Sequence, residues 1–154
     1  MAHLPIDPDI ESVGDPLHPF QLSVLATVFI GGCAGGLVRY LLSQHWPATH
    51  LFPWAVFTVN VAGAFVLGAV VVASEVAGPS SHLRPLIGTG FCGALTTFSS
   101  LVVAADELAA HGHAGLAATY VLASVAAGVA AAWLGLTLCR RITGWRDEAA
   151  PGAG

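Results

Sequence analysis

The chain carries very little charge. Only 9% of its 154 residues are charged, whereas an ordinary soluble domain has about 25%. Lysine is absent, and five arginines stand against nine acidic residues, for a formal net charge of -4. A nucleic-acid binder needs basic residues to neutralise phosphates, so this composition excludes that class. Since 55% of the residues are hydrophobic, an intrinsically disordered chain is excluded too, and a small integral membrane protein remains.

Cysteine and catalytic groups are also scarce. The three cysteines Cys33, Cys92 and Cys139 are far apart, each within an apolar run. With an odd number, no Cys-x-x-Cys and no histidine at metal spacing, they favour neither a disulfide framework nor a zinc site. We interpret them as small buried hydrophobic residues. No Ser/His/Asp or Cys/His group falls at one membrane level, so we do not expect an enzyme.

Four apolar runs follow an acidic start. Residues 1–21 contain acids and prolines but no Lys or Arg, so they do not match a signal peptide and are interpreted as a disordered N-terminal tail. The runs cover about 22–42, 54–74, 86–105 and 114–138, each long enough to cross a bilayer as a helix. None shows the polar stripe of a soluble bundle. We predict an all-α membrane protein with four transmembrane helices in a domain at 22–139, and a cytoplasmic C-terminal tail at 140–154.

The few arginines are unevenly placed. Four spans put both termini on one side, together with Arg84, Arg140, Arg141 and Arg146, while the other side has only Arg39. The positive-inside rule therefore predicts cytoplasmic termini and a location in the cell membrane. Arg39 alone reads as an anchor that reaches the interface; its alternative is an electropositive lip that attracts anions.

The third run is the unusual one. Residues 88–100 read GTGFCGALTTFSS, with three glycines and five hydroxyl side chains, which makes a poor helix. Within a membrane, freed backbone groups are tolerated where they are buried in protein or face water or an ion. We therefore predict that the third helix is broken near the midplane. The alternative is that these small residues only allow close packing.

Uncharged polar residues also occur in the other spans. Asn60 in the second span serves either as an interhelical hydrogen bond or as a donor lining a pore. Tyr120, Ser124 and Gly128 recur every four residues and share one face of the fourth helix. In the first span, Gly31-x-x-x-Gly35 and the same spacing one residue later allow close backbone approach; we interpret these glycines as structural.

Three of these segments resemble the Fluc, or CrcB, fluoride channel family. They are GGCAGGLVRY (31–40), VNVAGAFVLG (59–68) and GTGFCGALTTFSS (88–100), one per span and in the family's order. The Tyr-x-x-x-Ser-x-x-x-Gly of the fourth span follows them. The resemblance covers roughly residues 22 to 140, and its third motif is the specific one.

The resemblance implies a passive fluoride channel that protects the cytoplasm from fluoride. It implies an antiparallel dimer with two narrow pores and a sodium ion at the dimer centre, held by the backbone carbonyls of Gly93 and Thr96. Neutral donors suit fluoride, because an ion must bind well enough to enter and weakly enough to leave. Arg39 would lie at an anion vestibule. The implied pore-lining residues are Asn60, Phe98, Ser99, Tyr120 and Ser124.

One departure from the family's pattern bears on assembly. The family run continues to a second Phe, where this chain has Leu101. A homodimer would therefore lack half of an aromatic pair, and the uneven arginines oppose insertion in both orientations. We hypothesise a heterodimer with a homologous subunit of opposite orientation. The alternatives are a non-conducting structural partner, or a small transporter of another substrate; no embedded carboxylate is available for a proton-driven exporter.

Overall fold

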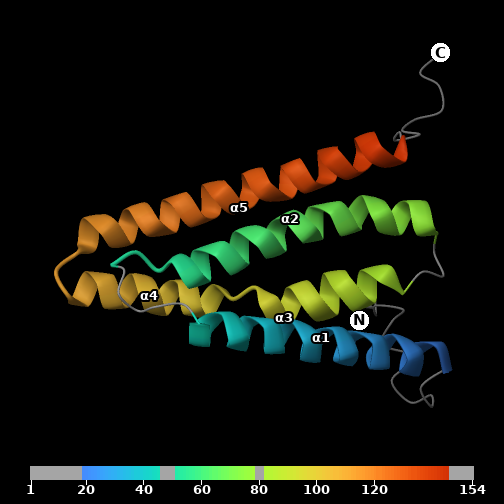
Figure 1. The fold of residues 1–154 in the computed structure, drawn as a ribbon, viewed down its shortest axis with the longest axis horizontal. Helices are drawn as coiled ribbons and strands as arrows, with labels where there is room; N and C mark the ends of the chain where they lie inside the picture. Colours follow the sequence, from blue (N-terminus) through green and yellow to red (C-terminus); the bar gives the residue numbers. More distant parts are fainter. Residues whose placement is uncertain (1–18, 46–50, 79–81, 146–154) are drawn as a thin grey trace, which may run out of the picture.

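The computed structural model describes residues 19–45, 51–78 and 82–145 of the chain. Within these residues it forms four long apolar helical stretches that run side by side (Figure 1). Each is long and apolar enough to cross a membrane: Gln21–His45, Trp54–Ala77, Arg84–Ala110 and Ala114–Thr143. The prediction of an all-α membrane protein with four spans is confirmed.

The helix bounds differ from the predicted ones mainly at the ends. The first, second and fourth stretches are α1 (Pro19–His45), α2 (Trp54–Ala77) and α5 (Ala114–Thr143). The third consists of η2 (Arg84–Cys92), α3 (Gly93–Leu95) and α4 (Phe98–Ala110). Because α1 already begins at Pro19, the expected disorder is wrong for the last three residues of the predicted 1–21 tail. Residues 1–18 and 146–154 lie outside the described residues.

The third span changes its helical form along its length. It begins as the π-helical η2, continues as one short turn of α-helix, and is then interrupted at Thr96 and Thr97. These two residues are extended, with φ and ψ of -77° and 150° at Thr96 and of -149° and 115° at Thr97. The predicted break is confirmed, whereas the π-helical start was not predicted.

The four stretches pair in two ways. In Figure 1, α2 lies along α5, and α1 lies along η2 and α3. The chain then turns after α4, so that α4 packs against the start of α5. The broken span thus lies between α1 on one side and α2 on the other, and the break faces α2 directly.

Glycine makes the contact between α1 and the third span close. A side chain at Gly31 would overlap the Leu86 carbonyl oxygen, and one at Gly35 would overlap the Phe91 carbonyl oxygen. At Gly36 the same addition meets nothing within 4 Å. The predicted close approach is therefore made by the Gly31/Gly35 pair, and its backbone contact fixes the third span against α1.

Few side chains are buried inside the subunit. The main cluster is Leu101, Leu108, Ala117 and Tyr120, where α4 meets α5. Many large hydrophobic side chains are exposed on the outer faces, as lipid and further subunits permit. Cys92 is buried but Cys33 is exposed, so the interpretation of the cysteines as buried residues is wrong for Cys33.

Candidate functional site at the broken third helix

Asn60 of α2 bridges the break in the third span. Its Nδ2 donates to the Thr97 carbonyl oxygen at 3.1 Å, and its Oδ1 accepts from the Thr97 backbone N–H at 2.8 Å. One half-buried side chain thus satisfies both backbone groups of a residue that belongs to no helix. An unsatisfied amide in apolar surroundings costs roughly 2–7 kcal/mol, so Asn60 stabilises the break. Asn60 therefore makes the interhelical hydrogen bond that was one of its two predicted roles. Its other predicted role, as a donor that lines a pore, stays a prediction.

The break releases backbone carbonyls on its N-terminal side, among them those of Gly93 and Thr96. In an unbroken helix the Thr97 N–H would bond to the Gly93 carbonyl, and the Ser100 N–H to the Thr96 carbonyl. Here the first N–H donates to Asn60 and the second to Thr97 Oγ1, at 3.2 Å. Gly93 is exposed, and a Cβ placed on it would meet nothing within 4 Å. The two carbonyls named from the resemblance are therefore among those that lose their helical donors.

The hydroxyl groups at the break complete the helix ends. Thr97 Oγ1 donates to Ser100 Oγ at 3.1 Å and lies 3.1 Å from Ser99 Oγ. Since a hydroxyl has one proton, Ser99 is the donor in its pair with Thr97. On the other side of the break, the Thr96 hydroxyl donates to the Cys92 carbonyl at 2.9 Å. The threonines cap and close the two half-helices, while Ser99 lies on the exposed side.

Phe98 and Leu101 stand one helical turn apart on α4 and differ sharply in burial. Phe98 is 77% exposed on the outside of the subunit, whereas Leu101 is 6% exposed and packs in the cluster with Tyr120. A phenyl ring left almost bare at the start of α4 is not part of this subunit's own core. It is available to a second subunit, and Leu101 is not.

Tyr120 and Ser124 place two hydroxyl groups inside the subunit. Tyr120 is fully buried and Ser124 is 5% exposed. Neither hydroxyl has a hydrogen-bond partner within the part of the chain that the structure describes. Buried polar groups of native proteins are usually paired with protein, water or an ion. The two hydroxyl groups on this face of α5 could therefore bind a small polar ligand.

An aromatic group surrounds Tyr120 at one end of the fold. The Phe52 ring lies 5.3 Å from the Tyr120 ring, nearly perpendicular to it at 87°. Phe52 also contacts Trp54 and Phe57, with ring centroids 4.5 and 5.6 Å away. Sequence reasoning missed Phe52 because it precedes α2 and belongs to no periodic pattern. The signal that could have found it is the enrichment of aromatic residues at the ends of membrane spans.

Comparison with known proteins identifies the family. The family model described as "CrcB-like protein, Camphor Resistance (CrcB)" matches residues 26–136, which include all four spans' cores and the break. The chain belongs to the CrcB family. It is 48% identical over 122 residues to "Fluoride-specific ion channel FluC 1" of Mycolicibacterium paratuberculosis, covering 77% of this chain and 91% of that protein.

Other CrcB relatives are similar over most of their length. "Fluoride-specific ion channel FluC 1" of Mycobacterium bovis is 46% identical over 129 residues, covering 82% of this chain and 96% of that protein. The protein of the same name in Streptomyces coelicolor is 38% identical over 130 residues, covering 83% and 84%. The resemblance predicted from the three motifs is confirmed, and the matched region contains every residue named at the site.

The structure brings the predicted site residues together in two groups. The first group lies at the break, where Asn60 bonds to Thr97. Phe98 and Ser99 follow Thr97 in the chain, and the carbonyls of Gly93 and Thr96 precede it. Tyr120 and Ser124, one turn apart on α5, form the second group, and Tyr120 packs against Leu101 of α4. Arg39 belongs to neither group. It is half-buried on α1, towards the end at His45, and no hydrogen bond or ion pair joins it to the break within the described residues.

Proposed function

We propose that this CrcB-family chain is a subunit of a fluoride-selective ion channel that lets fluoride leave the cell passively. The observation that carries the proposal is the broken third span held by Asn60, with neutral donors around it. The printed names of its relatives support fluoride as the ion. Such a protein is a channel and not an enzyme, and it protects the cytoplasm from fluoride toxicity.

The chemistry of the site suits a small, strongly hydrated anion. Hydroxyl and amide donors can replace the water that fluoride loses, and the positive edge of a phenyl ring adds a weak attraction. Tyr120 and Ser124 would supply hydroxyls, Asn60 its amide and Phe98 its ring edge, and Ser99 would join them by turning its hydroxyl proton from Thr97 to the ion. None of these residues carries a fixed positive charge, so a bound anion is not trapped.

A structural sodium ion fits the carbonyls at the break. Gly93 and Thr96 lose their helical donors there, and carbonyl oxygens are the ligands that hard cations prefer. We place the ion between two subunits, where its charge would attract anions without occupying a pore. Among the described residues no group of three or more His, Cys, Asp or Glu side chains could hold a metal ion, and this site needs none.

The subunit is proposed to work as an antiparallel dimer, with a homologous but different partner. The exposed Phe98 ring supports an interface at this face. Leu101 stands where the family's second Phe is expected, so the partner would supply that ring. The uneven placement of the arginines assigns this chain one orientation, with cytoplasmic termini. Arg39 would then lie at the opposite mouth, as part of an anion vestibule.

Co-expression tests the function and the assembly together. Liposomes containing this chain with a homologous four-span partner are expected to release fluoride rapidly, as read by a fluoride electrode. Liposomes with this chain alone are expected to release little, and tags on its ends should be accessible from one side only. Fast release from the chain alone, with tags on both sides, would contradict the heterodimer and support a homodimeric channel.

A further inference from the structure

We propose that the C-terminal end of α5 binds an anionic phospholipid of the leaflet at which α1 begins and α5 ends. The site consists of a basic pair, Arg140 and Arg141, and an apolar groove beside it. It lies away from the break and does not depend on which ion the protein conducts.

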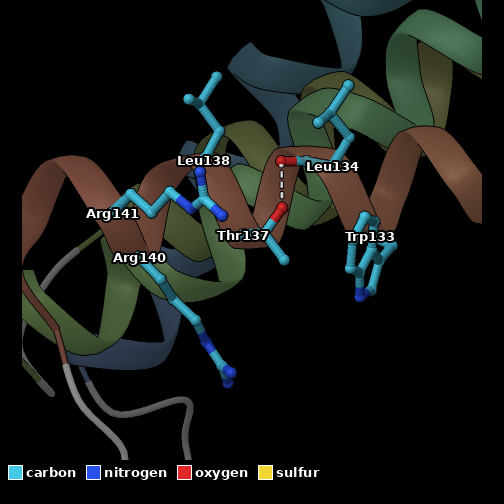
Figure 2. Close-up of a pocket in the computed structure, with 6 residues that line it drawn as sticks. All are labelled: Trp133, Leu134, Thr137, Leu138, Arg140 and Arg141. Carbon is cyan, nitrogen blue, oxygen red and sulfur yellow. Dashed lines mark hydrogen bonds between the residues drawn. The ribbon is translucent and has the colours of Figure 1, made fainter.

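The basic pair stands in the last turn of α5. There the helix's own terminal carbonyls favour positive charge. The Arg140 guanidinium carbon lies 5.0 Å from the centre of the Trp145 ring, so a cation–π contact helps to fix its position. Figure 2 shows the Arg141 side chain running back along the helix towards Thr137 and Leu138. Both arginines line the groove, with the Arg140 side chain pointing away from Arg141 and Leu138 in Figure 2.

The groove continues from the arginines along the helix. A cavity of about 380 Å³ is lined by the two arginines with Trp133, Leu134, Thr137 and Leu138. Trp133 is 66% exposed and Leu134 is 52% exposed. A second, almost wholly apolar cavity of about 430 Å³ between α2 and α5 also includes Leu134. The apolar wall is therefore continuous from the basic pair into the cleft between these helices.

The part of the wall that α5 forms is about as long as one leaflet is thick. On α2 the second cavity continues as far as Phe57, near the Tyr120 end of the fold. Along α5 itself, from Arg141 to Ala131, the wall rises about 15 Å. This is roughly half of the 30 Å hydrocarbon thickness. A headgroup at the arginines would thus lay its acyl chain over Trp133 and Leu134 and reach the bilayer centre.

The combination of charge and apolar surface selects a lipid as the occupant. Guanidinium groups bind phosphate oxygens through paired hydrogen bonds. A free phosphate ion would use the arginines but has no need of the leucine and tryptophan wall. Anionic phospholipids complement both parts, and they are attracted by basic residues at the membrane surface. Trp133 lines the groove, so its fluorescence would report the presence of a bound acyl chain.

Tryptophan quenching by brominated lipid tests the site. The full-length protein is reconstituted in phosphatidylcholine vesicles containing a minority of phosphatidylglycerol, with bromine on the acyl chains of one lipid or the other. The Trp133 signal is isolated by comparison with Trp133→Phe. We expect brominated phosphatidylglycerol to occupy the site with about a tenfold preference over its bulk fraction, and Arg140→Gln/Arg141→Gln to abolish that preference.

A matched pair of single variants separates the site from general charge. Arg141→Gln and Arg84→Gln each remove one exposed arginine, and only Arg141→Gln should weaken the preference. Equal quenching by the two lipids, or equal loss in the two variants, would overturn the proposal. Absence of quenching by either lipid would overturn it too, because a second subunit would then cover the groove.

Discussion

Asn60 and Thr97 are joined by two hydrogen bonds, of 2.8 and 3.1 Å, that take the place of helical bonding at the break. The pair connects α2 to the third span at the one point where that span has no helix of its own. Because the Thr97 N–H donates to Asn60, it no longer donates to the Gly93 carbonyl, which is left without its helical hydrogen bond. The proposed ion chemistry follows from this single contact.

Asn60→Leu is expected to damage both folding and transport. It leaves the N–H and the carbonyl of Thr97 without partners, at a cost of about 1–3 kcal/mol for each buried group. Thermal unfolding in detergent and fluoride efflux should both fall. Asn60→Asp is the control, because its carboxylate still accepts from the Thr97 N–H but cannot donate to the carbonyl. An Asn60→Leu protein as stable and active as the parent would refute the bridging role.

Phe98→Ala is expected to lower fluoride flux without destabilising the subunit. The ring is 77% exposed, so its removal leaves no cavity in the subunit's core. Phe29→Ala is a matched control, since Phe29 is 72% exposed on α1. Flux should fall strongly for Phe98→Ala only, with assembly unchanged by size-exclusion chromatography. Equal flux in the two variants would mean that Phe98 does not line the pathway.

Tyr120→Phe removes a hydroxyl group that has no partner within the described residues. Losing an unpaired buried hydroxyl should leave stability unchanged or raise it by about 1 kcal/mol. Fluoride efflux should nevertheless fall, because the pathway loses a donor. Tyr40→Phe, on an exposed tyrosine of α1, should alter neither property. If Tyr120→Phe conducts normally, this hydroxyl is not used by the ion.

Gly35→Ala and Gly36→Ala form a paired test of the helix packing. A methyl group at Gly35 meets the Phe91 backbone, which cannot move aside easily, whereas one at Gly36 meets open space. Overpacking typically costs about 1–3 kcal/mol, so the first variant should unfold at a lower temperature. The second should match the parent. Similar melting temperatures for both would show that α1 does not pack through Gly35.

Much of the fold could be predicted from composition. The length of each apolar run is enough to place a membrane span, and the glycines and hydroxyls of 88–100 are enough to predict the break. The pairing of helices could not be predicted in the same way. Without polar stripes, every face of each helix is equally able to pack or to face lipid. The two overlapping glycine pairs of the first span indicated a contact surface, and only Gly31/Gly35 makes it.

The site was predictable in its residues more than in its contacts. Asn60 and Tyr120 stood out because polar groups are costly in hydrocarbon. That Asn60 reaches Thr97, and that Leu101 is buried while Phe98 is exposed, depends on how α2 and α5 pack around the third span. The π-helical start of that span has no compositional signal, because the same residues serve an α-helix equally well.

The most direct test of the central claim is fluoride release from liposomes loaded with potassium fluoride, with this chain and its homologous partner reconstituted together. Passive conduction predicts that fluoride leaves rapidly only after valinomycin provides a path for potassium, and that chloride does not leave at a comparable rate. It also predicts no dependence on a proton gradient. Fluoride release that needs such a gradient, or chloride release as fast as fluoride release, would contradict the account.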